Sequence, residues 1–252
     1  MIITGTQNDN QRTPEWIQSR MGRFSCSQLH RLMGEPKATT KTKYYLYDIE
    51  ITEKLFMKNI EAGKFDGLSS IKETSKPESK LSDGAITYVM ECIAEKLTGK
   101  PAKDDFTSKY TDWGVMHEPI AIGIYEEVFG CKVTQSGYIP YGENFGGSPD
   151  GLIDDAGGIE IKCPYTITAH LVHSITKDLK ADYKECYWQI IGYLIITGRE
   201  WFDFVSYHPE YPGKYQFKRI RIERSQVLAD IEQAEKKIQQ ATEQLNLILN
   251  SI

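Results

Sequence analysis

The strongest constraint on the fold is a change in the hydrophobic pattern at residue 131. Before it, apolar side chains repeat at helical spacing; after it, short strand patterns alternate with helical ones. The expected helices span 85–100, 111–130, 166–177 and 182–196, and the expected strands lie within 131–163, 201–209 and 215–224. This order predicts an α/β fold in which helices flank a central mixed sheet.

The rest of the chain is predicted to be mostly helical. Thr13 and Pro14 are typical of a helix start, which places a helix at 13–20. Further helices are predicted at 25–33, 44–58 and 225–252, and the Lys-, Ser- and Gly-rich segment 59–84 is predicted to be a mobile loop. The heptads of 225–252 allow either a coiled coil or packing along the helix's own domain. At 252 residues the chain suits one domain, 1–252.

Composition excludes several classes of protein. The five cysteines are scattered without a CxxC pair, which argues against a zinc site or an iron–sulfur cluster. A net charge of −5 argues weakly against a basic nucleic-acid coat, although residues 12–43 form a basic island. The chain has no run of eighteen apolar residues, and MIITGTQNDNQR is too short and polar for a secretory signal, so a cytoplasmic location without membrane contact is expected.

The stretch GGSPDGLIDDAGGIEIKCP, residues 146–164, carries the candidate chemistry. GLID and GIEIK read as two short strands around a DDAGG reversal. Glu160 and Lys162 are two positions apart on the second strand and so project from one face. Because Asp150 begins the first strand, the hairpin is expected to bring Asp150, Glu160 and Lys162 to one point.

Two converging carboxylates repel each other unless a cation joins them. Mg²⁺ suits this site, with Mn²⁺ as a substitute, because it takes oxygen ligands and keeps several waters. The backbone carbonyl of Ile161 lies between the two side chains as a further ligand. Lys162 would orient a metal-bound water, or take its proton, for attack on a phosphodiester. Taken alone, an Asp and an E-x-K at this spacing are more often solvated strand charges.

The surrounding motifs resemble one family. Ser148-Pro149-Asp150-Gly151 and Glu160-Ile161-Lys162 resemble the PD-(D/E)xK nuclease core in its phage lambda exonuclease form, the YqaJ-type viral recombinase family. Further similar motifs are WIQSRMGRFSCS from Trp16 to Ser27, Trp113-Gly114…Glu118, QIIGYLIITG from Gln189, and Tyr207-His208-Pro209. They run in the family's order over residues 13–250, so the resemblance implies a restriction-endonuclease-like core.

The resemblance also implies residue roles. Asp150, Glu160, Glu118 and the Ile161 carbonyl would bind the metal, Lys162 would position the attacking water, and Gln189 would order the lysine or the scissile phosphate. Arg20, Ser27 and Ser148 match residues that hold a 5′-terminal phosphate, and Trp16 matches an aromatic where the strands separate. A second phosphate-binding arginine is expected eight residues after Glu160, where Thr168 stands instead; Arg23 or a lysine would have to replace it.

The function that the resemblance implies is a Mg²⁺-dependent 5′-to-3′ exonuclease acting on the ends of linear double-stranded DNA. It would release mononucleotides and leave a 3′ single strand for phage-type recombination, with a single-strand annealing protein as partner, as a homotrimer encoded by a phage or prophage in a bacterial host. Two alternatives stay open. One is a PD-(D/E)xK endonuclease of restriction or junction-resolving type, and the other is a non-catalytic DNA-binding protein on the same fold.

Overall fold

The computed structural model describes residues 13–75, 80–102 and 109–252. Contacts divide the chain into two compact units, one formed by Glu35–Asp83 and the other by the residues on either side of it. The expectation of one domain over residues 1–252 stays a prediction, and the unit Glu35–Asp83 lies within those bounds. Each unit is described below by itself.

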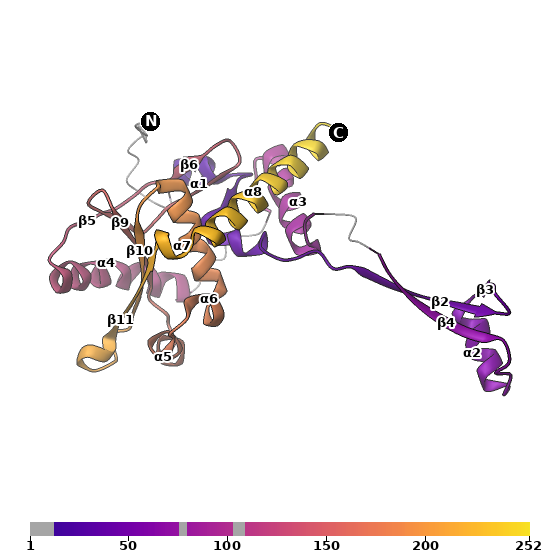
Figure 1. The fold of residues 1–252 in the computed structure, drawn as a ribbon. Coiled ribbons are helices and arrows are strands. Elements are labelled where there is room, and N and C mark those ends of the chain that lie inside the picture. Colours follow the sequence, from indigo (N-terminus) through magenta and orange to yellow (C-terminus); the bar gives the residue numbers. More distant parts are fainter. Residues whose placement is uncertain (1–12, 76–79, 103–108) are drawn as a thin grey trace. The chain divides into compact units, whose positions relative to one another are not determined.

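The larger unit is built on a five-stranded mixed sheet in the order β11-β10-β9-β8-β5 (Figure 1). Its strands are β5 (Val133–Thr134), β8 (Gly151–Ile153), β9 (Gly157–Lys162), β10 (Trp201–Tyr207) and β11 (Phe217–Glu223). β8 and β9 form the predicted antiparallel hairpin, whereas β9 and β10 are parallel. Parallel neighbours need a long crossover, and the chain between β9 and β10 supplies it as helices. The predicted mixed sheet is therefore confirmed.

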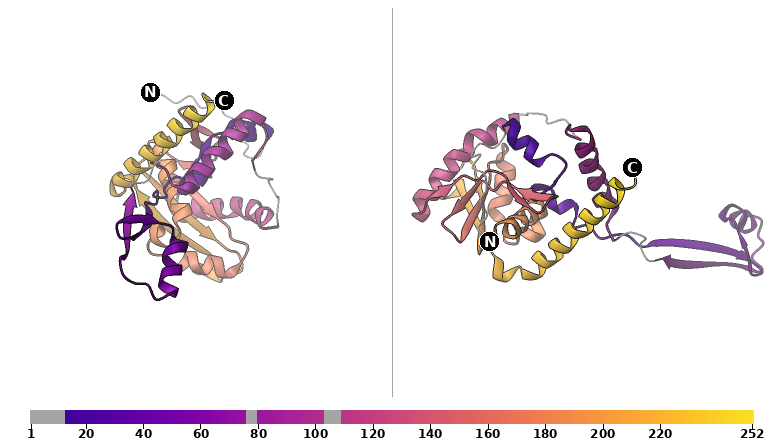
Figure 2. Two further views of the ribbon diagram at one scale, coloured as in Figure 1. Left: turned by 90° about the vertical axis from the view of Figure 1, so that its right-hand side faces the viewer. Right: turned by 90° about the horizontal axis from the view of Figure 1, so that it is seen from above.

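Helices cover both faces of this sheet (Figures 1 and 2). From residue 83 onward the helices are α3 (Asp83–Thr98), α4 (Lys109–Phe129), α5 (Ile167–Ile175), α6 (Leu179–Asp182), α7 (Lys184–Thr197) and α8 (Leu228–Leu249), with short 3-10 turns η2 (Gly213–Gln216) and η3 (Arg224–Gln226). Of these, α4, α5 and α7 contact the strands of the sheet. The predicted helices and strands after residue 85 are confirmed within a few residues. No helix among the described residues is both long and apolar enough to cross a membrane.

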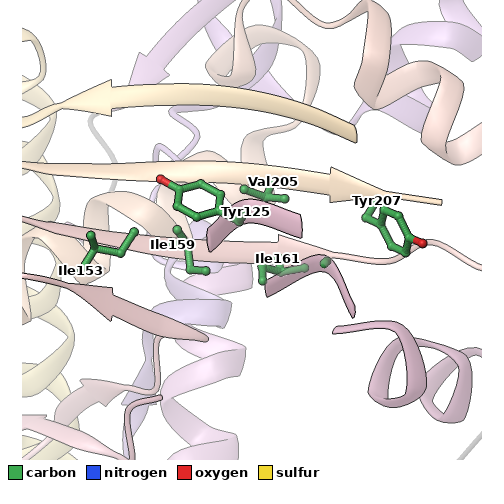
Figure 3. Close-up of a cluster of buried hydrophobic side chains, with 7 residues drawn as sticks. Tyr125, Ile153, Ile159, Ile161, Val205 and Tyr207 are labelled. Atoms are coloured by element: carbon green, nitrogen blue, oxygen red, sulfur yellow. The ribbon is translucent and has the colours of Figure 1, made fainter. Parts of the chain in front are cut away.

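One face of the sheet packs against α4. Figure 3 shows Tyr125 of α4 over Ile153, Ile159, Ile161 and Val205 of the strands, in a cluster whose members are at most 7% exposed. Because side chains alternate along a strand, the isoleucines of β9 point toward α4. Glu160 and Lys162 must then point to the opposite face.

That opposite face is covered by α7, which is buried at every position from Cys186 to Ile196. α8 in turn packs on α7 (Figure 2). Its buried side chains are the heptad residues Ile231, Ala234, Ile238, Ala241 and Leu245, with Lys237 beside them. The heptads of the C-terminal segment therefore serve packing along the helix's own unit.

The N-terminal segment is held beside the β8–β9 hairpin by a second, three-stranded sheet in the order β1-β7-β6. Its strands are β1 (Phe24–Ser25), β6 (Ile139–Tyr141) and β7 (Phe145–Gly147). In the chain, α1 (Pro14–Arg20) precedes β1 and the 3-10 helix η1 (Cys26–Arg31) follows it. Thr13 caps α1 as predicted by accepting from the Trp16 backbone N–H at 3.2 Å. The prediction of an α-helix at 25–33 is wrong, because the segment forms the end of β1 and a six-residue 3-10 helix.

The smaller unit differs most from expectation. A helix was predicted at 44–58 and a loop at 59–84. The structure instead has β2 (Thr39–Leu46), β3 (Ile49–Ile51), α2 (Glu53–Glu61) and β4 (Leu68–Ser75), with β2 central in the sheet. The predicted loop residues 76–79 lie outside the described residues.

The physical reason for this correction lies in the turn and in the cap. Tyr47 and Asp48 both have positive φ, 49° and 64°, and reverse the chain between β2 and β3 as a two-residue hairpin turn does. Thr52 then caps α2 by accepting from the Leu55 backbone N–H at 3.3 Å. The helix thus begins only after residue 52, and the apolar residues before it belong to strands.

Candidate active site

The predicted carboxylate and lysine of β9 lie on one face and contact each other. Lys162 Nζ donates to Glu160 Oε1 at 2.5 Å and to Gln189 Oε1 of α7 at 3.4 Å. Glu160 is only 2% exposed, while the Lys162 side chain is about one-third exposed. The ammonium group is therefore held between a strand carboxylate and a helix amide, with one side open.

Asp150 is fixed to the same point by the backbone. Its Oδ2 accepts a hydrogen bond from the Ile161 N–H at 2.6 Å, so the residue that precedes β8 is joined to the C-terminal end of β9. Burial and the negative charges of Glu160 and then Glu118 raise the pKa of Asp150 well above its ordinary value. Glu160, and Glu118 from α4, thus both act electrostatically on Asp150.

The same negative field also raises the pKa of Lys162. Burial by itself lowers the pKa of Lys162 and is the largest single influence, but the charge of Glu160, then Cys186 and Asp150, and the hydrogen bond to Glu160 together outweigh it. The net result is a pKa above the ordinary lysine value. The lysine is consequently a cation and a hydrogen-bond donor at neutral pH.

The carboxylate pair fits a divalent cation. Glu160 Oε2 is buried and has no hydrogen-bond partner, which is costly for an acceptor with a full charge. A cation between Asp150 and Glu160 would satisfy that oxygen and relieve the repulsion that raises the pKa of Asp150. Among the described residues, no three His, Cys, Asp or Glu side chains gather closely enough to hold a metal by themselves. A carbonyl and waters would have to complete the coordination shell, as Mg²⁺ accepts.

Gln189 connects the lysine to a second part of the site. Gln189 Nε2 donates to the Tyr193 hydroxyl at 2.7 Å, and that hydroxyl donates to the Ser148 carbonyl at 3.1 Å. Both side chains are buried and come from one face of α7, four residues apart. Sequence reasoning did not single out Tyr193; the signal available for it was the i,i+4 spacing after Gln189.

Three of the four predicted DNA-binding residues lie together. Trp16 Nε1 donates to Ser148 Oγ at 2.9 Å, and the Arg20 guanidinium lies 4.1 Å from the centre of the Trp16 ring. Ser27 Oγ instead lies 3.1 Å from Ser25 Oγ. Trp16, Arg20 and Ser148 therefore form one cluster, and Ser27 pairs with its own segment.

The charges of Arg20 and Glu160 both act on one buried thiol, that of Cys26. After burial, the largest influence on the pKa of Cys26 is Glu160, which raises it, and Arg20 lowers it. One buried thiol on η1 therefore lies within reach of both charges. Thr168 is exposed on α5, and the Arg23 guanidinium lies 5.9 Å from the Tyr138 ring centre.

Comparisons with known proteins agree with this arrangement. The model of the YqaJ-like viral recombinase domain matches residues 67–200, more than half of the chain. An alkaline exonuclease from Laribacter hongkongensis, LHK-Exo, is similar over 95% of this chain and 97% of its own, with 26% identity and a TM-score of 0.63. Its complex with dAMP gives a TM-score of 0.64 at the same identity and coverage.

A phage-related exonuclease from Haemophilus somnus 129PT shares the fold at 19% identity. It covers 91% of this chain and 96% of its own, with a TM-score of 0.63. A comparison with curated proteins finds no significant match. The predicted restriction-endonuclease-like core is thus found in solved structures that align over nearly their full length.

Proposed function

Because the chain belongs to the YqaJ-like viral recombinase family and is a nuclease that hydrolyses DNA phosphodiester bonds, we propose that it is a metal-dependent exonuclease. It degrades one strand of linear double-stranded DNA from the 5′ end, releases mononucleotides and leaves a 3′ single strand. The observation that carries the proposal is the convergence of Asp150, Glu160 and Lys162 at one end of the β8–β9 hairpin.

Asp150, Glu160 and the Ile161 carbonyl are the residues that would hold the metal, Mg²⁺ or Mn²⁺ in its place. Glu118 would join them only after a movement of its side chain, because the described residues hold no group of three such side chains close enough for a metal. When bound, a divalent cation supplies positive charge where a phosphodiester develops negative charge and lowers the pKa of water. The unpartnered Glu160 Oε2 and the raised pKa of Asp150 support this assignment. Glu118 supports it only through its electrostatic effect on Asp150.

Lys162 positions the attacking water. Its ammonium is fixed by Glu160 and Gln189, which leaves one donor direction for a water molecule or a phosphate oxygen on the open side. A raised pKa keeps Lys162 protonated, so it orients the water by donation and does not remove its proton. Gln189 in this scheme orders the lysine, and Tyr193 orders Gln189.

End recognition falls to the N-terminal cluster. Arg20 offers a guanidinium, Ser148 and Ser27 offer hydroxyls, and Trp16 offers a ring against which the terminal nucleotide can lie. The bond between Trp16 and Ser148 places this cluster two residues before Asp150. A 5′-terminal phosphate held there would lie beside the bond to be cut, which sets the polarity. Thr168 offers no charge, so Arg20 and Arg23 carry the positive charge of this pocket.

The biological setting is part of the same proposal. A resected 3′ strand is the substrate of a single-strand annealing protein, which is the partner we propose in phage-type recombination. We propose further that the enzyme acts as a homotrimer around DNA ends, in the cytoplasm of a bacterial host that carries the phage or prophage.

The test uses a linear duplex labelled at either 5′ or 3′ ends, with and without a 5′ phosphate, incubated with the protein and Mg²⁺. Mononucleotides released first from the 5′ label, and faster with the phosphate, are expected. Release from the 3′ label first would contradict the polarity, and no release from either end would contradict catalysis. A closed circular plasmid is the matched control, since cutting it would identify an endonuclease.

A further inference from the structure

A cluster of partly exposed aromatic side chains lies where α4 begins and where the catalytic hairpin ends. Tyr110 is on the first turn of α4 and is 55% exposed; Tyr165 follows β9 and is 40% exposed. Their rings meet edge to face, with centroids 5.1 Å apart and planes at 86°. Two large aromatic surfaces therefore face solvent side by side.

A lysine completes the cluster. Lys109 Nζ lies 5.3 Å from the Tyr110 ring centre and 5.1 Å from that of Tyr165, within the range of a cation–π contact. Lys109 is itself exposed and its four-carbon stem is flexible, so the ammonium can leave the rings for a nearby phosphate. The three side chains together combine aromatic faces with one positive charge.

The two tyrosines rest on a fixed support. Trp113, one turn along α4 from Tyr110, contacts Tyr165 edge to face at 5.4 Å and the His117 ring at 4.0 Å. His117 is 7% exposed and its Nδ1 lies 2.8 Å from the Trp113 carbonyl oxygen. The buried layer holds the ring of Tyr165 in place, while the exposed faces of both tyrosines remain outside the core cluster around Tyr125.

The cluster is also next to the proposed chemistry. Tyr165 stands three residues after Lys162, and three residues of extended chain span at most about 10 Å. Trp113 and Glu118 lie on the same helix. A DNA strand whose phosphodiester reaches Lys162 therefore passes within reach of the two tyrosines.

Exposed aromatic faces beside a lysine are the chemistry that binds single-stranded nucleic acid, since every base has a face to stack and a phosphate to neutralise. We propose that Lys109, Tyr110 and Tyr165 form a stacking subsite for an unpaired base of the DNA strand that enters the active site. This inference rests on the proposed function. It adds a contact with bases, distinct from the phosphate contacts of Arg20 and Ser148, and it predicts little preference among the four bases.

The test measures binding of a single-stranded oligonucleotide that carries 2-aminopurine near its 5′ end, with EDTA present so that no cleavage occurs. Tyr110→Ala and Tyr165→Ala are each expected to weaken binding about tenfold and to relieve the quenching of 2-aminopurine. Tyr110→Phe and Tyr165→Phe keep the ring and are expected to bind as the unchanged protein does.

The matched control is Tyr215→Ala. Tyr215 is 59% exposed and has the Lys214 ammonium 5.4 Å from its ring centre, but it lies on η2, outside the proposed subsite. Its substitution is expected to leave binding and quenching unchanged. Equal loss in the control, or alanine variants at 110 and 165 that bind and quench normally, would overturn the subsite.

Failure of the subsite and failure of the proposed function give different results. Digestion of linear duplex with Mg²⁺ by the unchanged protein, without any effect of the tyrosine substitutions on oligonucleotide binding, would remove the subsite alone. Tyrosine-dependent quenching in a protein that digests no DNA would support the subsite and remove the exonuclease proposal. Circular dichroism of each variant shows whether it is folded.

Discussion

The Asp150 carboxylate accepts a hydrogen bond from the Ile161 backbone N–H at 2.6 Å, across the β8–β9 hairpin. This bond fixes Asp150 relative to Glu160, because Glu160 and Ile161 are neighbours on one strand. A hydrogen bond to a carboxylate favours the ionised form, yet burial and two like charges prevail and raise the pKa of Asp150. The backbone hydrogen bond thus fixes the position of a carboxylate whose protonated form is favoured by burial and by the neighbouring negative charges.

Replacing Lys162 with alanine is expected to abolish digestion of linear DNA while DNA binding persists. The reason is that the variant loses the donor held between Glu160 and Gln189 but keeps the proposed phosphate contacts of Arg20, Ser27 and Ser148. Rates of nucleotide release and equilibrium binding of labelled duplex measure the two effects. Lys236→Ala, an exposed lysine of α8, is the control and should digest normally. Undiminished release by Lys162→Ala would refute the assigned role.

Adding Mg²⁺ is expected to raise the melting temperature of the unchanged protein. A ligand at one hundred times its Kd adds about 2.7 kcal/mol to the free energy of unfolding. Glu160→Gln should lose this response, since an amide in place of Glu160 removes one of the two charges that attract the cation. Glu185→Gln, on the exposed start of α7, should keep it. Calorimetry with and without EDTA gives the shifts, and an equal shift in both variants would exclude Glu160 as a ligand.

Tyr193→Phe is expected to lower kcat by about tenfold with little change in KM. It removes the hydroxyl that joins Gln189 to the Ser148 carbonyl and leaves two buried polar groups without that partner, a loss of about 1–3 kcal/mol. Tyr187→Phe removes a hydroxyl from the same helix, one that bonds Asp230 at 2.6 Å away from the site. The control should lose stability but not kcat. Similar kinetics for both variants would show that Tyr193 acts only in packing.

Stability is expected to fall as the pH is lowered from about 6.5 toward 4. Burial, then the charges of His170 and Lys162, lower the pKa of His173 to about 4. A histidine whose pKa is lower in the folded state contributes stability above its unfolded pKa, and that contribution disappears as pH falls through the folded value. Ser206, His170, Tyr183 and Phe204 face this ring, and none of them supplies a negative charge.

His173→Asn tests this pH dependence, because asparagine cannot titrate and its side-chain amide can still reach Ser206. The free energy of unfolding, measured with urea between pH 7.5 and 4.5, should fall less steeply in the variant than in the unchanged protein. Parallel curves for the two proteins would mean that other groups cause the loss.

Gly192→Ala is expected to destabilise the protein by about 1–3 kcal/mol. An added Cβ would lie 2.9 Å from Cys26 Sγ and 3.0 Å from Cys26 Cβ, so α7 and η1 would have to separate. Gly123→Ala on α4 meets nothing within 4 Å and should instead stabilise by about 1 kcal/mol, since alanine favours a helix. Urea unfolding of the two variants should therefore give opposite signs.

The part of the site that could be predicted from the sequence is the part that local spacing determines. Glu160 and Lys162 share a face because side chains of a strand alternate, and Asp150 meets them because a short hairpin leaves no other register. The contact of Trp16 with Ser148 and the place of Arg20 depend on the parallel pairing of β1 with β7, and no local pattern encodes that pairing. Family resemblance supplied those residues where periodicity could not.

The fold shows the same division. α7 was predictable because a long apolar segment ends at Gly198, which caps the helix with a φ of 69°. α8 was predictable from the heptad spacing of its apolar residues. Residues 39–51 and 68–75 were not, because β2 and β4 gain their strand conformation from each other, across the intervening α2. A lysine- and serine-rich strand such as β4 carries no alternation that distinguishes it from a loop.

The bond between Trp16 and Ser148 joins residues 132 positions apart in the chain. Contacts of such long sequence separation form late, after loop-closure entropy has been overcome. The Gln189 and Tyr193 contacts require a still later segment of the polypeptide. A ribosome-bound chain that has not yet emerged through α7 therefore lacks the contacts that join Gln189 and Tyr193 to Lys162 and Ser148.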